Sequence, residues 1–374
     1  MNKLKTEIKN KFYKSVYNHY GEENYDTYRF GPYPDQFKNR HPITKLLKDK
    51  IRKIFGVRNA ITDNFFDHAY QKIQPHEKGL ERIYEKISEQ GKNTVIELLA
   101  YHMLGFEKVK LSNNNDAYHK AIKEVNALIN SKDYIQSNYQ SLKLFKFDLN
   151  SLGYDIRLFF NTAGVVTDFI VEQYAYKENN KALVEAEPGD TVLDLGACWG
   201  DTAHYFASKA GPSGKVYSFE FIPENIKLFK QNKELNPNLK ENITIVAHPV
   251  SDVSDVEVYF KDNGPGSIMK MESFPEQTGS VKTICIDDFV ERYNVEKVDF
   301  IKMDIEGAEP MALNGAINTI KKFRPRLAIA NYHGLGDFTN IPNWILDLGL
   351  DYEIFIGHYT IHAEETVCFA RPKS

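Results

Sequence analysis

The hydrophobic residues of this chain follow one rhythm up to about residue 148 and a different one after it. In the first part they recur every three or four positions, which is typical of one buried face of a helix. The pattern is seen over 95–103 and 117–129, in "ITKLLKDKIRKIFG" (43–56), which ends at a glycine, and at Leu80, Ile83, Tyr84 and Ile87. We therefore predict a mainly helical region over residues 1–148.

From residue 149 to residue 374, short apolar segments alternate with stretches of helical spacing. The predicted strands are "TVLDL" (191–195), "KVYSFEF" (215–221), "ITIVAH" (243–248), "VDFIKMDI" (298–305) and "RLAIAN" (326–331). The predicted helices lie near 202–210, 223–236, 308–322 and 340–348. This alternation predicts an α/β core over 189–374, a parallel sheet with helices on both faces.

Two further predictions concern the end of the chain and the segment that precedes this core. The segments 352–356 and 365–370 are expected to close the chain as an antiparallel pair of strands. Residues 152–176 are expected to form a β-hairpin, with Gly164 in its turn.

Composition narrows the class of protein. The chain has 374 residues, of which 42% are hydrophobic and 26% charged, as in an ordinary globular protein large enough for two cores. It contains no apolar run of about 20 residues that would span a bilayer. We do not expect a secretory signal, because the basic N-terminal stretch lacks an uninterrupted apolar core. Its three cysteines lack CxxC spacing, which argues against a disulfide framework or a metal cluster. We expect a cytoplasmic location.

The charge is unevenly distributed. Residues 1–60 contain 14 Lys and Arg against 6 Asp and Glu, although the whole chain has a net charge of −4. Solvated helix faces are the simplest explanation. The alternative is peripheral contact with an anionic membrane or a lipid-linked glycan. A nucleic acid is not expected as a partner, because the excess is modest and no motif that reads nucleic acid accompanies it.

The stretch "VLDLGACWGDTA" (192–203) has the form of a first strand, a glycine turn and the start of a helix. Ligands of open α/β sheets bind at the carboxyl ends of such strands. Gly196 permits the tight turn and Gly200 permits close packing at the helix start. Asp201 or Thr202 is expected to cap the helix.

A second acid strengthens this prediction. Glu220 ends the next predicted strand, 26 residues after Asp194, where a carboxylate can accept hydrogen bonds from both hydroxyls of a ribose. The turn lacks the GxGxxG pattern of a dinucleotide site. Acids at Asp194, Asp201 and Glu220 would repel a diphosphate and attract a cation. A cationic adenosine compound, S-adenosylmethionine, is therefore the predicted cofactor.

Five stretches, taken in order, resemble the FkbM family of S-adenosylmethionine-dependent methyltransferases. They are "EQYAY" (172–176), "PGDTVLDLGACWGDTA" (188–203), "GKVYSFEFIPEN" (214–225), "VDFIKMDIEGAE" (298–309) and "ETVCFA" (365–370). The resemblance spans roughly residues 152–372. It implies a class I methyltransferase fold, Rossmann-like, with a seven-stranded, mostly parallel sheet.

The resemblance also implies roles for single residues. Those assigned to the methionine end of the cofactor are Asp194, Gly196, Ala197 and Gly200. Glu220 is assigned to the ribose, and those expected around the adenine are Phe221, Ile222, Ser251 and Asp252. Tyr174 is expected to cover the cofactor, and the pocket is completed by Asp201, Thr202 and Asp304.

Three residues are candidates for the chemistry itself. Asp304 and Glu306 lie on one side of the strand if it extends that far, and could orient an acceptor hydroxyl, take its proton or bind a divalent ion. His333 follows the next strand and could act as a general base, or could be a packing or capping histidine. We predict no metal site, because the end of this strand offers Asn331 and His333 instead of an acid pair.

The acceptor class is less sharply indicated. The chain lacks the NPP[YF] and DPPY stretches of amino-methylating enzymes that act on nucleic acids, which favours O-methylation. The resemblance implies a hydroxyl acceptor on a sugar, a polysaccharide or a glycan precursor. Two alternatives remain at this point: a nicotinamide-dependent oxidoreductase, and a non-catalytic binding protein that retains the fold.

Overall fold

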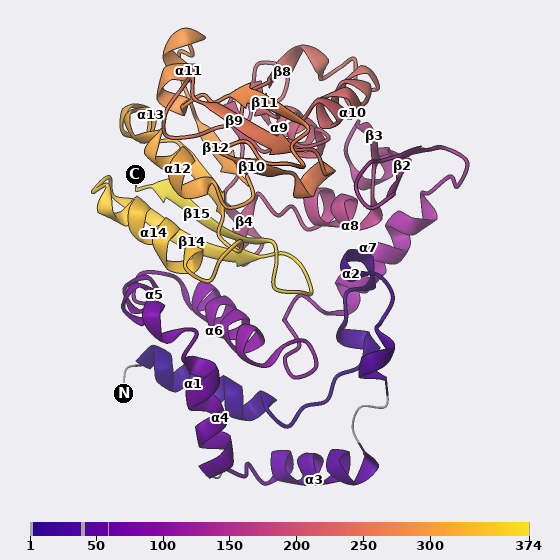
Figure 1. The fold of residues 1–374 in the computed structure, drawn as a ribbon, viewed down its shortest axis with the longest axis vertical. Coiled ribbons are helices and arrows are strands. Elements are labelled where there is room, and N and C mark those ends of the chain that lie inside the picture. The colour runs from indigo at the N-terminus through magenta and orange to yellow at the C-terminus, as the bar shows by residue number, and fades with distance from the viewer. Residues whose placement is uncertain (1–2, 39–41, 59, 374) are drawn as a thin grey trace.

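A computed structural model describes residues 3–38, 42–58 and 60–373. Its centre is a seven-stranded sheet with the strand order β14-β15-β13-β12-β6-β7-β8 (Figure 1). The five strands from β13 to β8 pair in parallel, and β15 is antiparallel to both of its neighbours. The strands are β6 (Thr191–Leu195), β7 (Lys215–Phe219), β8 (Ile243–Val246), β12 (Phe300–Met303), β13 (Arg326–Ala330), β14 (Tyr352–His358) and β15 (Thr366–Pro372). This confirms the predicted class I methyltransferase sheet.

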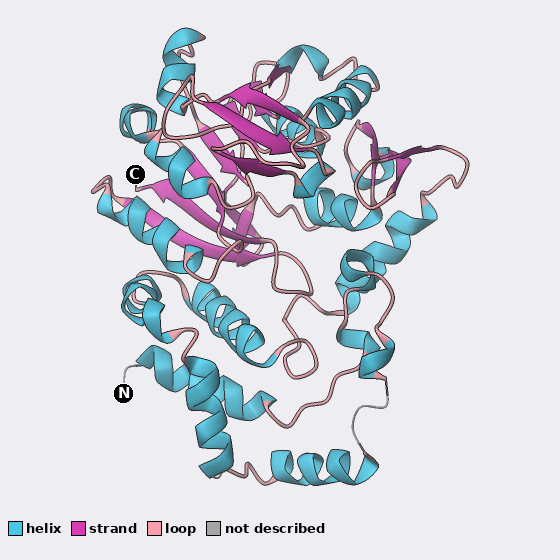
Figure 2. Cartoon of the chain, in the orientation of Figure 1, coloured by secondary structure: helices cyan, strands magenta, loops and turns pink. Residues whose placement is uncertain are grey.

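Helices cover both faces of this sheet (Figure 2). Alternate residues of a strand point to opposite faces, so Leu193 joins the core on one side while Val192 joins the core on the other. The helices of this part are α9 (Asp201–Ala210), α10 (Pro223–Glu234), α11 (Ile286–Arg292), α12 (Glu309–Asn314), α13 (Ile317–Phe323) and α14 (Asp337–Asp347). The helix predicted near 308–322 is thus two short helices.

The N-terminal part of the chain is mainly helical, as predicted. α6 packs on the edge strand β14, α1 packs on α6, and α5 packs on α14. Their apolar side chains share one core with the sheet. The helices are α1 (Lys3–Ser15), α2 (Thr27–Phe30), α3 (Ile43–Ile54), α4 (Ala60–Tyr70), α5 (Glu77–Tyr84), α6 (Glu89–Leu104) and α7 (Asp116–Ala127).

The predicted hairpin over 152–176 is wrong in its second half. β3 (Arg157–Phe160) does form, but it pairs with β2 (Lys143–Asp148), which also pairs with β1 (Tyr134–Gln136). The chain then becomes helical in α8 (Thr162–Val165) and a π-helical turn, Val166–Ile170.

A local cap explains that difference. The Asn161 side chain accepts a hydrogen bond from the Gly164 N–H at 2.8 Å and starts the helix. Burial of the following β-branched residues against α7 and α9 then outweighs their preference for strands.

Two small sheets complete the fold. β4 (Tyr176–Glu178) pairs with β5 (Lys181–Val184) just before the central sheet. Between β8 and α11 lies a three-stranded sheet in which β9 (Glu257–Lys261) pairs with β10 (Ile268–Lys270) and β11 (Gly279–Lys282). Hydrophobic pattern alone does not predict this second small sheet, because its strands alternate between more and less exposed residues instead of forming apolar runs.

Candidate functional site

The glycine turn after β6 is shaped by close packing. Gly196 has φ +84°, and a Cβ at this position would lie 1.8 Å from the carbonyl oxygen of Asp304. Gly200 has φ +85°, and its Cβ would lie 2.2 Å from the ring of Phe229. Both positions therefore require glycine, and the predicted close packing at Gly200 is confirmed. Ala197 between them is buried.

The expected cap of α9 is wrong. Gly200 occupies the N-cap position, and no side chain accepts a capping hydrogen bond there. The Thr202 hydroxyl instead donates to the Asp194 carboxylate, 3.0 Å from each oxygen. Asp201 stands in the first turn of the helix, where the positive end of the helix dipole favours an acid.

Asp194 is buried and anchors the turn. Its carboxylate lies 3.3 Å from Lys302 Nζ and also accepts from the Ser218 hydroxyl at 3.2 Å. Lys302 Nζ donates to the carbonyl oxygens of Leu195 and Gly196 at 3.1 and 2.8 Å. Burial tends to lower the pKa of Lys302, but the neighbouring carboxylates outweigh this and raise it, so the ammonium stays charged. The sequence analysis missed Lys302, although a lysine inside the apolar stretch "FIKM" was a signal.

Glu220 follows β7 at the same edge of the sheet. One carboxylate oxygen accepts from the Ile222 N–H at 2.7 Å and the other from the Asn225 amide at 3.2 Å. Burial raises the pKa of Glu220 to about 7. Ile222 is buried, and Phe221 packs on Phe260 of β9 with ring centroids 5.6 Å apart. The second small sheet therefore forms a wall beside the predicted adenine position.

Ser251 and Asp252 lie beyond β8, as the sequence suggests. Ser251 is buried, its N–H donates to the Ile284 carbonyl at 3.1 Å, and its hydroxyl donates to Asp252 at 3.1 Å. Their role at the adenine stays a prediction.

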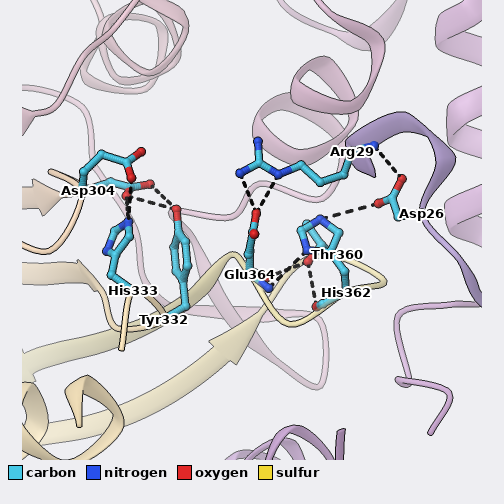
Figure 3. Close-up of polar contacts among 9 residues, drawn as sticks. Asp26, Arg29, Asp304, Tyr332, His333, Thr360, His362 and Glu364 are labelled. Carbon is cyan, nitrogen blue, oxygen red and sulfur yellow. Dashed lines mark hydrogen bonds and ion pairs between the residues drawn. The ribbon is translucent and has the colours of Figure 1, made fainter. Parts of the chain in front are cut away.

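A cluster of polar side chains gathers at the ends of β12 and β13 (Figure 3). The Asp304 carboxylate accepts hydrogen bonds from the Tyr174 hydroxyl at 2.9 Å and from the Tyr332 hydroxyl at 3.2 Å. His333 Nε2 lies 3.5 Å from Asp304 and 3.7 Å from Glu306, and Nδ1 lies 3.4 Å from Glu309. The structure thus brings together the three candidates for the chemistry, with Glu309 and Tyr332 beside them.

Glu306 sits on a turn and not on the strand. β12 ends at Met303, and Glu306 has φ +57°, a left-handed conformation that is uncommon for a residue other than glycine. The expectation that the strand places Asp304 and Glu306 on one side is therefore wrong, although both reach His333. Burial and the charge of Asp304 raise the pKa of Glu306 to about 7, while its side chain remains 56% exposed. It is an accessible carboxylate whose protonation changes near neutral pH.

His333, in contrast to Glu306, stays charged around neutral pH. Burial tends to lower its pKa, but Glu309, Asp304 and Glu306 outweigh burial and raise it to about 9. The imidazole is therefore protonated at neutral pH and is a poor proton acceptor, which disfavours the general-base alternative. Its charge holds the surrounding acids together.

The same electrostatics bear on metal binding. Asp304, Glu309 and His333 offer one donor atom each within 4.8 Å of one another, which is close enough for a divalent cation. A protonated imidazole has no lone pair for a metal, so an ion would first have to displace that proton. One oxygen of Glu309 is already an acceptor for the Ile305 N–H at 2.8 Å. We therefore interpret the cluster as an ion-pair network, and the absence of a metal stays a prediction.

Two acids that the sequence pattern does not single out, Asp168 and Glu365, lie near Asp201 and Asp304. Burial raises the pKa of Asp168, in the π-helical turn, well above its usual range, and the pKa of neighbouring Asp201 to about 6. Burial and the charge of Asp304 raise the pKa of Glu365 to about 8. The proximity of Asp168 to Asp201, and of Glu365 to Asp304, depends on how the chain runs after α8 and before β15. The local sequence pattern does not predict this path.

The helical N-terminal part also reaches this region. Arg29 of α2 forms an ion pair with Glu364 at 2.6 Å, and His362 lies 3.6 Å from Asp26 (Figure 3). The loop between β14 and β15, next to Glu365, is thus held by residues far away in the sequence.

The residues present fit a cationic adenosine compound. Carboxylic acids whose pKa values are raised by burial gain stability when a cation approaches. In the described part of the chain, Gln173 Oε1 and both amide atoms of Asn331 are also buried without a hydrogen-bond partner. These unsatisfied groups flank Tyr174 and Tyr332, and such atoms are commonly satisfied by a bound ligand or water.

Comparison with known proteins agrees with this geometry. Residues 184–354 match the sequence model of the methyltransferase FkbM domain. This part of the chain belongs to the FkbM methyltransferases. Its cofactor is S-adenosylmethionine, the methyl donor of class I methyltransferases. The match decides against the nicotinamide-dependent alternative.

Individual relatives are more distant. The hexuronic acid methyltransferase AglP of Haloferax volcanii is 25% identical over 172 residues, 46% of this chain and 68% of that protein. An arsenite methyltransferase of Halobacterium salinarum is 35% identical over 79 residues, 20% of each chain. The crystal structure of the methyltransferase FkbM from Methylobacillus flagellatus KT matches with a TM-score of 0.52 and 16% identity, covering 88% of this chain and 72% of that one. At this identity the structural match shows the fold.

No helix within residues 3–38, 42–58 and 60–373 is long and apolar enough to cross a bilayer.

Proposed function

We propose that this methyltransferase transfers a methyl group to a hydroxyl of a sugar, in a glycan or a glycan precursor. The observation that carries the proposal is Glu306, an exposed carboxylate with a pKa of about 7 beside Asp304 and His333 at the ligand-binding edge. A proton acceptor with a pKa near the working pH suits an acceptor hydroxyl, which loses its proton as it is methylated. The distant relative named as a hexuronic acid methyltransferase supports a sugar acceptor.

When bound, S-adenosylmethionine would supply a methyl group on a positively charged sulfur. A Glu306 oxygen would take the proton of the acceptor hydroxyl as the methyl group passes from the sulfur to the acceptor oxygen. Asp304, fixed by the hydroxyls of Tyr174 and Tyr332, orients the acceptor. Most of the catalysis then comes from holding the reacting atoms in line.

The protein's own residues also hold the cofactor. Glu220 would accept hydrogen bonds from the ribose hydroxyls, and Phe221 and Ile222 would lie beside the adenine. Asp194 keeps Gly196 and Ala197 in place through Lys302 and Thr202. The acids Asp201 and Asp304 face the positive charge.

Methyl transfer from labelled S-adenosylmethionine tests the proposal directly. The purified enzyme is incubated with oligosaccharides that contain uronic acids, with neutral oligosaccharides, and with the same compounds in which the hydroxyls are already methylated. We expect label in a free-hydroxyl sugar and none in the premethylated control. Label in amine acceptors alone would overturn O-methylation. Cofactor binding without transfer to any acceptor or cell extract would favour the non-catalytic alternative.

A further inference from the structure

α3 stands at the outer end of the helical region, far from the central sheet (Figure 1). Asp49 is its one buried residue; the rest of the helix is exposed or half-buried. The Asp49 carboxylate lies 2.8 Å from His19 Nε2 and 3.2 Å from the Arg52 guanidinium. The helix is therefore attached to the protein through its polar side.

Its opposite side is apolar and open to solvent. The apolar stripe consists of Ile43, Leu47, Ile51 and Ile54, which are 55–75% exposed, and Phe55 beyond the helix end is 77% exposed. Asp49 is two positions away from Leu47 and from Ile51, so at about 100° per residue it lies about 160° from each. The stripe thus points directly away from the protein, where its exposure to water is unfavourable.

Positive charge borders the stripe. Lys48 and Lys50 are exposed on α3, on either side of the apolar residues. A cavity of about 400 Å³ opens beside the end of the helix, lined by Lys14, Arg52, Lys53 and Arg58 together with Tyr13 and Tyr17. None of the described residues that line it is acidic. Arg52 is already paired with Asp49, and the other three cations favour an anion such as a phosphate group.

We propose that α3 and this basic cavity dock the protein on an anionic phospholipid surface. The apolar stripe enters the boundary between head groups and acyl chains, as amphipathic helices with a basic polar face do. The lysines that border it extend toward lipid phosphates, and the cavity holds a head-group phosphate. This docking is independent of which acceptor the enzyme methylates.

The basic residues around the apolar stripe favour a membrane over two other binding partners, a second copy of the chain and a nucleic acid. A second copy of this chain, related by a two-fold axis, would bring the same basic residues together and repel. A nucleic acid would satisfy the lysines but leave the stripe in water. An anionic bilayer complements both features at once.

Sedimentation with vesicles tests the proposal on the full-length chain. The vesicles are phosphatidylcholine alone, or phosphatidylcholine mixed equally with phosphatidylglycerol. We expect the protein to pellet with the mixed vesicles, less so at high salt, and to stay in solution with phosphatidylcholine. The double variant Leu47→Glu/Ile51→Glu should lower the partition coefficient by about tenfold or more. Lys14→Ala/Arg58→Ala should lower it by about thirtyfold, which corresponds to about 1 kcal/mol for each of the two lost cations.

A matched control is Met271→Glu, which places a charge on an apolar residue that is 59% exposed outside the helical region. It should bind vesicles like the wild type. Unfolding curves of all variants should coincide with the wild type, because the altered side chains are exposed. The proposal is overturned if the wild-type protein does not bind the mixed vesicles. It is also overturned if sedimentation velocity shows that the wild-type protein is a dimer and that Leu47→Glu/Ile51→Glu is a monomer.

Discussion

Lys302 of β12 and Asp194 of β6 stand directly opposite each other in the parallel sheet, with 3.3 Å between Nζ and Oδ1 and both side chains buried. The pair joins the cofactor turn to β12, the strand that Asp304 follows. Lys302 also binds the carbonyl oxygens of Leu195 and Gly196. A charge pair in the core thus fixes the turn on which the cofactor is expected to lie.

Removing the cation of this pair should destabilise the fold strongly. Lys302→Met leaves the Asp194 carboxylate buried without its partner, which costs about 3–5 kcal/mol of unfolding free energy. Urea denaturation followed by circular dichroism measures this. In the double variant Lys302→Met/Asp194→Asn the buried charge is gone, so part of the stability should return. Equal losses in the single and double variants would show that the pair is not the cause.

The sequence predicted the parts of the fold that depend on local pattern. The five parallel strands are apolar because both of their faces are covered, and such runs are recognisable without a structure. The failure at 165–176 has a physical cause, because "VVTDFI" contains β-branched residues that form a strand or a buried helix according to their surroundings. The Asn161 cap and the packing on α7 and α9 decide for the helix.

The location of the site could likewise be predicted from local pattern, whereas several of its contacts could not. The carboxyl ends of parallel strands share one edge, so Asp194, Glu220, Asp304 and His333 could be expected to gather there. The Lys302 contact depends on strand register, and the contacts of Asp168 and Glu365 depend on segments that return from elsewhere in the chain. The charge state of His333 follows from three acids whose convergence no spacing reveals.

Glu220 should determine cofactor affinity. In Glu220→Gln the oxygen that accepts from the Ile222 N–H remains, but the charge that strengthens hydrogen bonds from the ribose is lost. Such bonds are worth about 1.5–3 kcal/mol, so the Kd for S-adenosylmethionine should rise about tenfold or more. Isothermal titration calorimetry measures it. Glu224→Gln, an exposed glutamate four positions further on, is the matched control and should bind like the wild type. Unchanged affinity in Glu220→Gln would remove Glu220 from the ribose site.

Glu306 should matter for the reaction and not for cofactor binding. Glu306→Gln keeps the size of the side chain but cannot accept a proton, so kcat should fall by about 10²–10⁴-fold. The Kd for S-adenosylmethionine measured by calorimetry should stay within the error of the wild type. Glu296→Gln changes an exposed glutamate away from this cluster and should leave both quantities unchanged. A full loss of cofactor binding in Glu306→Gln would mean that this residue acts on the cofactor.

The pH dependence should identify the proton acceptor. Burial and Asp304 raise the pKa of Glu306 to about 7, so below neutral pH the carboxyl is protonated and cannot take the hydroxyl proton. The value of kcat/KM should therefore fall about tenfold per pH unit on the acid side of that pKa. The residual activity of Glu306→Gln should lack this limb. A limb near pH 9 would instead point to His333, whose pKa is about 9.

Activity should not require a divalent metal. His333 is protonated among Asp304, Glu306 and Glu309, and that proton occupies the position that a cation would need. The enzyme dialysed against EDTA should retain its methyl transfer rate, and added Mg²⁺ or Mn²⁺ should not raise it. His333→Gln provides a second measurement. It removes the positive charge between the acids, so the pKa of Glu306 should rise and the acid limb should move to higher pH. A rate abolished by EDTA and restored by Mn²⁺ would show that a metal displaces the His333 proton.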